Sequence, residues 1–257
     1  MAWSPAGHEI IGEIAYQNLT PKAKAKCVAL LHTLDSIYPK SNFSKANVWA
    51  DQLKQRGIVI FNQWHYIDLP YSADGTEVQS PQKQNLVTVI QQSKEIIMGK
   101  KTNRFEKALF LRMLLHFVGD AHQPLHCINR FSKQYPQGDR GGNLFVIQHA
   151  HANNLHQLWD RGVDVFPKAL SHNQRMAFAQ QIQNEYPKQK LLGQINQLNP
   201  HQWCQESYQL AKDIVYRTPE KKAPSDAYYA KAQPIVKQQL ALAGYRLAAV
   251  LNEIFNV

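Results

Sequence analysis

Apolar residues recur at helical spacing along much of this chain. The Ser4-Pro5 pair is a helix-start signal, and the isoleucines at 10, 11 and 14 give the helix that follows one apolar stripe. A second signal, Thr20-Pro21, begins a helix that we expect to end near Leu34. Further helices are predicted over residues 44–56, 81–98 and 103–121, and again from residue 153 onwards.

The C-terminal third is also predicted to be helical, with breaks near residues 186–200 and 217–226. The last helix carries an apolar stripe that indicates a core-facing element, formed by Leu240, Ala243, Leu247, Val250, Leu251 and Ile254.

Two stretches depart from the helical pattern. Residues 61–70 (FNQWHYIDLP) are aromatic and β-branched, which predicts a short extended segment before a polar loop over 71–80. Residues 127–152 contain the turn-rich sequence GDRGGN and then LFVIQH, a candidate strand at 144–149. We therefore expect one mainly α domain over residues 1–257, a multi-helix bundle with a short β-hairpin or extended segments.

Composition narrows the class of protein without identifying it. Lys and Arg number 29 against 19 Asp and Glu, and the charge of +10 favours a polyanionic partner such as nucleic acid or an anionic membrane surface. No stretch approaches the roughly twenty apolar residues of a membrane span. The three cysteines cannot form a closed disulfide framework, and they lack the CxxC spacing of a zinc knuckle.

The segment HFVGDAHQPLH, residues 116–126, carries the densest candidate chemistry. His116 and Asp120 lie four residues apart on the predicted helix over 103–121, so both side chains reach one face. Pro124 should end that helix and let His126 approach from another direction, so one short segment could serve two metal sites. The alternative is a histidine-rich helix end that binds nothing.

The same four-residue spacing recurs in LHQLWD, which predicts a second His-Asp pair on one helix face. A zinc site with an open position needs only three protein ligands, so a larger set indicates a polynuclear cluster suited to phosphoester hydrolysis. Some of the histidines could instead cap helices or fill the core. The candidates are His8, Asp51, His65, His116, Asp120, His126, His156 and Asp160.

A series of segments matches one known family in the required order. GHEIIGEIA, VWAD, WHYID, HFVGDAHQPLHC, GDRGGN, LHQLWD and GYRLAAVLN resemble the zinc-dependent single-strand-specific nuclease and 3′-nucleotidase family, from residue 3 to about residue 252. The resemblance implies the fold of the trinuclear zinc phospholipase C enzymes. It also implies hydrolysis of single-stranded DNA and RNA to 5′-phosphorylated products, with 3′-mononucleotides as further substrates.

The resemblance further implies three zinc ions and assigns their ligands. One zinc takes Asp51, His65, His116 and Asp120; a neighbouring zinc takes Trp3 and His8 and shares Asp120 as a bridge; the third takes His126, His156 and Asp160. His122 matches a family position that is not a ligand. We expect Asp120 and Asp51 to be catalytic, with hydroxide at the Asp120-bridged pair attacking phosphorus and Asp51 helping to orient it.

Four further residues are candidate substrate contacts. Lys54, one turn after Asp51, and Arg161, next to Asp160, are the cations expected to reach the phosphate, unless they are ordinary solvated charges. At positions that form a base pocket in the family, Tyr66 would stack on a base and Asp68 would accept hydrogen bonds from its edge. A buried tyrosine and a helix-capping aspartate are the alternative. Single-strand preference follows, because paired bases cannot enter such a pocket.

The start of the chain departs from the family pattern. There the mature protein begins at the tryptophan, whose free amine and carbonyl oxygen chelate zinc, whereas Met1 and Ala2 precede Trp3 here. The first residues lack the apolar core of a signal peptide, so we expect that a signal peptide has been replaced by a start codon. We predict a secreted or periplasmic protein with no stable membrane association and no obligatory protein partner.

Two other classes of function stay open. A phospholipase C-type phosphodiesterase would use the same metals on a lipid, but the WHYID segment and the lack of an evident amphipathic membrane-binding face argue against it. A non-catalytic zinc or nucleic-acid binding protein would hold its metals in saturated coordination. The complete ligand sets argue against such a decayed site.

Overall fold

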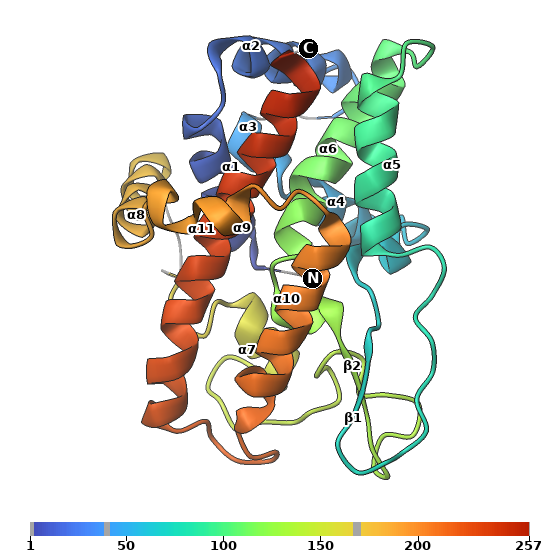
Figure 1. Cartoon of the computed structure of the whole chain (residues 1–257), viewed down its shortest axis with the longest axis vertical. Coiled ribbons are helices and arrows are strands. Elements are labelled where there is room, and N and C mark those ends of the chain that lie inside the picture. The colour runs from blue at the N-terminus through green and yellow to red at the C-terminus, as the bar shows by residue number, and fades with distance from the viewer. Residues whose placement is uncertain (1–2, 39–41, 167–170, 257) are drawn as a thin grey trace.

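The computed structural model describes residues 3–38, 42–166 and 171–256 (Figure 1). Most of its elements are helices, which confirms the predicted mainly α class. In chain order, with η for 3-10 helices, the elements are α1 (Pro5–Gln17), α2 (Pro21–Leu31), η1 (His32–Leu34), α3 (Phe43–Ala46), α4 (Trp49–Gln55), η2 (Asn62–His65), β1 (Pro70–Ser72), α5 (Leu86–Met98), α6 (Arg104–Asp120), η3 (Pro124–Cys127), β2 (Asn129–Phe131), α7 (Leu155–Asp160), α8 (His172–Glu185), η4 (Lys188–Leu191), α9 (Leu192–Ile195), α10 (Pro200–Asp213), η5 (Val215–Arg217) and α11 (Asp226–Asn256).

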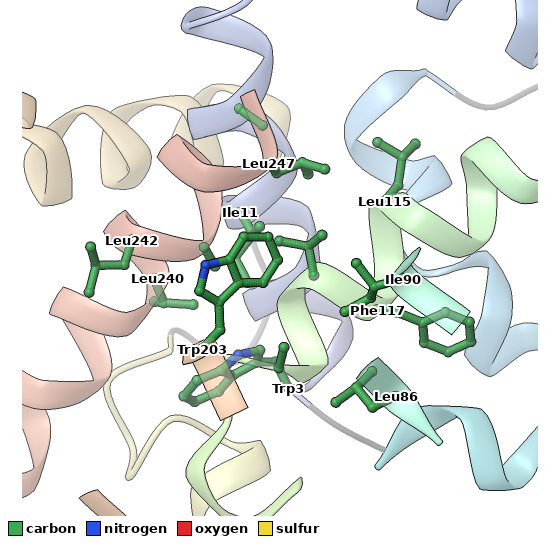
Figure 2. Close-up of a cluster of buried hydrophobic side chains, with 14 of the residues drawn as sticks. Trp3, Ile11, Leu86, Ile90, Leu115, Phe117, Trp203, Leu240, Leu242 and Leu247 are labelled. Carbon is green, nitrogen blue, oxygen red and sulfur yellow. The ribbon is translucent and has the colours of Figure 1, made fainter. Parts of the chain in front are cut away.

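The core lies where α11 passes α1 and α6 (Figure 1). A Cβ atom at Gly244 of α11 would lie 2.5 Å from the Cβ of Ile14, so glycine is what lets α11 approach α1 this closely. Figure 2 shows Trp203, Leu240 and Leu247 gathered in this core with Ile11 of α1. Every residue of the stripe predicted on the last helix is buried, which confirms its assignment to the core.

The predicted helix starts are confirmed at the N-terminus. Ser4 is the N-cap of α1 with proline at the first position, and the Thr20 side chain accepts a hydrogen bond from the Ala23 N–H at the start of α2. The helix predicted over 81–98 starts later, at Leu86. Asn85 caps it by accepting from the N–H groups of the second and third helical residues, and this local bond sets the boundary.

The helix predicted over 44–56 is divided into α3 and α4 around Asn47. The Asn47 side chain donates to the Phe43 carbonyl at 2.8 Å, and the Asn47 carbonyl accepts from His116 Nδ1 at 2.6 Å. In a continuous helix that carbonyl would accept the N–H four residues later. The interruption therefore frees a backbone acceptor for a side chain of α6.

The strands differ from the prediction. β1 and β2 pair in parallel, with Tyr71 opposite Arg130. Of the two predicted alternatives, the β-hairpin is therefore wrong and short extended segments are confirmed. Within the predicted extended segment 61–70, Asn62–His65 form the 3-10 helix η2, Tyr66 has an extended backbone, and β1 begins at Pro70. None of the described helices is long and apolar enough to cross a membrane.

The strand predicted at 144–149 is also wrong. Its alternation is present, because Phe145 and Ile147 are buried while Val146 is exposed. A strand also needs a continuous partner, however, and Val146 makes only an isolated bridge to Asn154. The predicted break at 186–200 contains two short helices, η4 and α9.

Candidate metal centre

Asp120 stands at the meeting point of three histidines that come from separate elements. Its Oδ1 lies 3.3 Å from the Nε2 atoms of both His8 on α1 and His116 on α6. Its Oδ2 lies 2.9 Å from Nδ1 of His65 at the end of η2. The structure therefore brings these predicted site residues together around one carboxylate.

Asp51 of α4 lies beside the same group of side chains. Its Oδ1 lies 3.9 Å from both His65 Nδ1 and His116 Nε2. The rings of His8 and His116 stack with centroids 4.0 Å apart. Candidate donor atoms lie within 4.8 Å of one another in two sets that share His116: one adds His8 and Asp51, and the other adds His65 and Asp120.

A third set of donors joins η3 to α7. His126 follows Pro124 in η3, and α7 carries His156 and Asp160 at the predicted four-residue spacing. Their donor atoms lie within 4.8 Å of one another, with His156 Nε2 at 3.5 Å from Asp160 Oδ1. Because α6 ends at Asp120 and the chain turns before η3, one short segment supplies both neighbouring groups, as predicted.

Unsatisfied buried atoms show that this donor set fits a cation. Both carboxylate oxygens of Asp51, both ring nitrogens of His8 and Oδ1 of Asp120 are buried without a hydrogen-bond partner among the described residues. Each such atom costs about 1–3 kcal/mol when it is left unpaired. Carboxylate oxygens and imidazole nitrogens are ligands for divalent metals, so these groups could each hold a metal ion.

Backbone carbonyls orient three of the imidazoles. His116 Nδ1 donates to the Asn47 carbonyl at 2.6 Å, His126 Nδ1 to the His65 carbonyl at 2.6 Å, and His156 Nδ1 to the Gly141 carbonyl at 2.7 Å. This arrangement leaves Nε2 of each ring directed into the donor groups. A metal-binding histidine is held in the required tautomer by such a bond on its other nitrogen.

The pKa values of the buried histidines and carboxylates depend on one another's charges. Burial disfavours charge on His116, but the carboxylates of Asp120 and Asp51 outweigh it and raise the His116 pKa to about 9. Burial likewise opposes the charge on Asp120, and His116 and the other imidazoles hold its pKa well below the ordinary range. For His8, burial and the neighbouring His116 lower the pKa, which favours the neutral imidazole that binds metals.

A sequence comparison identifies the family. The model of the S1/P1 nuclease family matches residues 3–256. The chain belongs to the S1/P1 nuclease family. Membership makes it a nuclease, an enzyme that hydrolyses phosphodiester bonds, and it accords with the predicted relationship.

Named relatives of the chain come from plants and fungi. Endonuclease 2 of Arabidopsis thaliana is 29% identical over 282 residues, which cover 99% of this chain and 91% of that protein. Endonuclease 1 of the same plant is 28% identical over 99% of this chain and 88% of its own length. Nuclease S1 of Aspergillus oryzae is 24% identical, with 98% of this chain and 91% of that protein covered.

In this S1/P1 family member a cleft of about 510 Å³ opens beside the donor groups. Its walls include Asp51, His65, His126 and His156, together with the predicted substrate contacts Lys54, Tyr66 and Asp68. Arg161 is not among the lining residues, so its contact with substrate stays a prediction. Arg140 of the GDRGGN loop supplies a lining cation that sequence reasoning missed.

The GDRGGN loop is built so that it can support His156. Gly141 has φ +60°, and a Cβ there would lie 2.3 Å from the Leu125 carbonyl oxygen, so only glycine fits. The buried Asp139 carboxylate accepts from the N–H of Gly142 at 3.0 Å and from the Tyr216 hydroxyl at 2.8 Å. The sequence predicts a turn here and includes the motif in the family resemblance, but it assigns no supporting role to Asp139.

Gln123 is a second residue that sequence reasoning missed. Its Nε2 donates to Asp160 Oδ1 at 2.8 Å, and its Oε1 accepts from the Leu125 N–H at 2.6 Å. It therefore ties the third donor group to the turn before η3. Its place between two histidines of HQPLH was the only sequence signal.

His122 lies outside the donor groups, as the resemblance implied. Its Nδ1 donates to the Val118 carbonyl at 2.7 Å, and its Nε2 accepts from Arg246 at 3.0 Å. Burial and the Arg246 charge lower its pKa to about 3, so it is a neutral imidazole. Its two hydrogen bonds connect the C-terminal end of α6 to Arg246 of α11.

The start of the described chain lies against the donor groups. Trp3 is fully buried and donates from Nε1 to the Gly119 carbonyl at 3.1 Å, while the Ser4 N–H donates to the Asp160 carbonyl at 2.6 Å. Met1 and Ala2, whose persistence bears on the predicted role of Trp3, lie outside the described residues. The Trp3 ligand assignment therefore stays a prediction.

Gly119→Ala is expected to displace His8 from the site. A Cβ at this position would lie 2.9 Å from His8 Nδ1 and 3.0 Å from its Cε1, so the imidazole must move. We expect at least about a tenfold loss of kcat and a lower metal content, measured by steady-state hydrolysis and elemental analysis. Gly193→Ala, whose Cβ would meet nothing within 4 Å, is the matched control. Wild-type metal content and rate in Gly119→Ala would contradict the packing argument.

Asp68 should make stability depend on pH. Burial, and then the Asp139 charge, raise its pKa from 3.8 to about 6. The folded state therefore binds this proton more tightly than the unfolded state. The free energy of unfolding falls as pH rises from about 4 to about 6, and it stays lower above pH 6. We expect Asp68→Asn to stabilise the protein by about 2 kcal/mol near neutral pH and little at about pH 4, measured by urea unfolding.

Asp213→Asn, a change at an exposed aspartate, controls for the loss of one negative charge. The pH dependence of its unfolding free energy should follow that of the wild type. Equal stabilisation by Asp68→Asn at both pH values would show that the raised pKa of Asp68 does not contribute to the pH dependence of stability.

Proposed function

We propose that this S1/P1 family member is a secreted zinc-dependent endonuclease that hydrolyses single-stranded DNA and RNA to 5′-phosphorylated products and also acts as a 3′-nucleotidase. The observation that carries the proposal is the position of the buried His and Asp groups at the wall of a cleft that also presents cations and a tyrosine. One cleft thus presents candidate metal ligands, cations that could contact a phosphate and a ring on which a base could stack.

We propose three zinc ions for the site. Asp51, His65, His116 and Asp120 would hold one, and Trp3 and His8 with Asp120 as a bridge would hold its neighbour. His126, His156 and Asp160 would hold the third. Nitrogen and carboxylate donors suit zinc, and the unsatisfied atoms of Asp51, His8 and Asp120 support this donor set. When bound, the ions would lower the pKa of water and neutralise phosphate charge.

The protein side chains of the cleft would position the substrate. Lys54 and Arg140 line the wall and would attract the phosphate, and the carboxylate of Asp51, which also lines the cleft, would orient the attacking water. Arg161, next to Asp160, is retained as a further phosphate contact on sequence grounds alone. Placing these charges in advance lowers the reorganisation needed when charge develops on the phosphate oxygens.

Tyr66 and Asp68 would form the base pocket. Both are half-buried and line the cleft on the extended segment that follows His65. A base stacked on the tyrosine could donate to the aspartate from its edge. Only an unpaired base can enter such a recess, which supports the preference for single strands.

One assay panel tests the proposed function. Wild-type protein is incubated with single-stranded DNA, RNA, duplex DNA, 3′-AMP and phosphatidylcholine, each with and without a chelator. We expect the single strands and 3′-AMP to be hydrolysed, with chelator-sensitive rates and 5′-phosphate ends on the products. Hydrolysis of phosphatidylcholine alone would indicate the phospholipase class, and metal binding without any hydrolysis would indicate a binding protein.

We also propose that the protein acts outside the cytoplasm, in a secreted or periplasmic form. The support is the family resemblance, in which a free amine on the tryptophan matched by Trp3 is a ligand. Intact-mass analysis of protein recovered from its native compartment would then give a chain that starts at Trp3. Protein there that retains Met1 and Ala2 would contradict the proposal.

A further inference from the structure

A second pocket lies behind the two-stranded sheet. In β2, Asn129 lines the metal cleft, whereas the next residue, Arg130, lines the second pocket. Successive residues of a strand point to opposite faces, so the sheet separates the two sites. The second pocket measures about 290 Å³, and its polar lining includes Arg130, Lys212, Arg217, Thr218 and Glu220.

Aromatic rings hold two of the pocket's cations in place. The Arg130 guanidinium lies 5.4 Å from the ring centroids of both Phe145 and Tyr216. Lys212 Nζ lies 5.5 Å from the centroid of the Tyr71 ring and 5.2 Å from that of the Tyr208 ring. These cation–π contacts occupy the ring faces and preorganise the charges. The arrangement suits an oxyanion better than a stacked base.

An unpartnered hydroxyl adds a neutral donor. Thr218 is only 5% exposed, and its Oγ1 has no hydrogen-bond partner among the described residues. A buried hydroxyl without a partner is destabilising, and an oxyanion in the pocket would accept its hydrogen bond. The hydroxyl is enclosed in the pocket wall, so an oxyanion would engage it only after the threonine side chain turns toward the pocket.

The balance of charge selects the class of oxyanion. Arg130, Lys212 and Arg217 face one carboxylate, Glu220, which leaves a formal charge of +2. Glu220 already accepts hydrogen bonds from the Tyr135 hydroxyl and, at 3.2 Å, from a glutamine side chain. A phosphate monoester carries roughly −1.5 to −2 at neutral pH, whereas a diester carries only one negative charge.

We propose that this pocket is a binding site for a phosphate monoester, separate from the metal cleft. Inorganic phosphate, a free 5′-nucleotide and the 5′-phosphorylated end of a strand all share this chemistry. Naming the strand end as the natural ligand rests on the proposed function, because cleavage to 5′-phosphate products would supply it. The binding itself does not depend on that function.

The pocket is joined to the cleft by one buried carboxylate. The Tyr216 hydroxyl donates to Asp139, which also accepts from the Arg130 N–H at 3.2 Å and from the Gly142 N–H at 3.0 Å. The loop held in this way carries Arg140 into the cleft. An oxyanion beside Arg130 and Tyr216 would therefore contact the residues that hold the Asp139 loop, and this loop places Arg140 in the wall of the metal cleft.

Calorimetric titration of the metal-loaded protein tests the proposal. The probes are inorganic phosphate and a phosphorothioate-linked dinucleotide with either a 5′-phosphate or a 5′-hydroxyl. We expect phosphate and the 5′-phosphorylated probe to bind at a site beyond the metal cleft, with affinity that weakens as salt is added. Lys212→Gln/Arg217→Gln should weaken this second site at least about tenfold, since it removes two of the charges.

Lys133→Gln is the matched control, because it removes an exposed cation that lines neither site. It should retain both sites. A wild type with one site, or a second site unchanged in Lys212→Gln/Arg217→Gln, would overturn the proposal. If Lys212→Gln/Arg217→Gln weakens the binding of phosphate but not of the 5′-phosphorylated probe, the ligand is the free anion. If it weakens the binding of the 5′-phosphorylated probe but not of phosphate, the ligand is the strand end.

Thr218→Val provides a test that changes no charge. The variant keeps the shape of the side chain, removes the unpartnered hydroxyl and should weaken phosphate binding severalfold without lowering Tm. Unchanged binding would remove the hydroxyl from the proposed site. Hydrolysis of single-stranded DNA by the same wild-type preparation is scored separately, so failure of the pocket and failure of the proposed function are distinguishable.

Discussion

Asp120→Asn is expected to lower phosphodiester hydrolysis by more than about 100-fold and to reduce the metal content. One carboxylate oxygen of Asp120 faces His8 and His116, and the other faces His65, so a neutral amide would present an N–H group where a ligand oxygen is needed. Steady-state hydrolysis of single-stranded DNA and elemental analysis of the same preparation measure both effects. The imidazoles would also lose the charge that holds them together.

Asp213→Asn is the control for this substitution, because Asp213 is exposed and its carboxylate accepts a hydrogen bond from the Gln209 side chain on the same helix at 2.8 Å. It should retain wild-type activity and metal. A full complement of metal in Asp120→Asn together with a normal kcat would refute the bridging role. If Asp120→Asn loses activity but keeps its full metal content, Asp120 acts in the hydrolysis step and is not needed to bind the metal.

Metal removal is expected to have the second largest effect, on activity and stability together. The carboxylates of Asp51 and Asp120 are buried, and that of Asp160 is half-buried. Without a cation, their negative charge must be balanced by protons on these groups or on the neighbouring histidines. Burial, and then the charges of Asp51 and Asp120, raise the Asp160 pKa well above its ordinary range. A ligand present at 1,000 times its Kd stabilises by about 4 kcal/mol, which corresponds to roughly 10 °C in Tm for a chain of this size.

Dialysis against a chelator, followed by thermal unfolding and hydrolysis assays, measures this prediction. Adding back Zn²⁺ should restore Tm and activity in parallel, whereas Mg²⁺, which favours octahedral oxygen ligands, should not. Identical Tm and activity before and after chelation would contradict a structural and catalytic metal centre. Recovery with Mg²⁺ alone would contradict the proposed identity of the metal.

The candidate donor residues that the structure brings together could be named from the sequence because their signals are local or occur in ordered motifs. The four-residue spacing of His116 with Asp120, and of His156 with Asp160, follows from helix geometry alone. Pro124 marks the turn that gives His126 its separate direction. The helix predictions at Ser4 and Thr20 succeeded for the same reason, because a cap is decided by a few neighbouring residues.

The supporting residues could not be predicted in this way. Gln123, Asp139 and the Asn47 carbonyl act through contacts with partners that lie from 3 to 77 residues away. A neutral amide or a backbone carbonyl has no distinctive pattern in a sequence. The failed strand at 144–149 shows the same limit, since alternation was present but no continuous partner strand was.

By itself, the sequence determined the helical class, the core stripe of the last helix and the set of candidate His and Asp donors, because periodicity and spacing are properties of adjacent residues. The tertiary structure decided which donors share a group, that Arg140 lines the cleft, and that Arg130 and Lys212 face a second pocket behind the sheet. The physical reason is that burial and hydrogen bonding depend on which distant elements pack together. Neighbouring residues do not encode that packing.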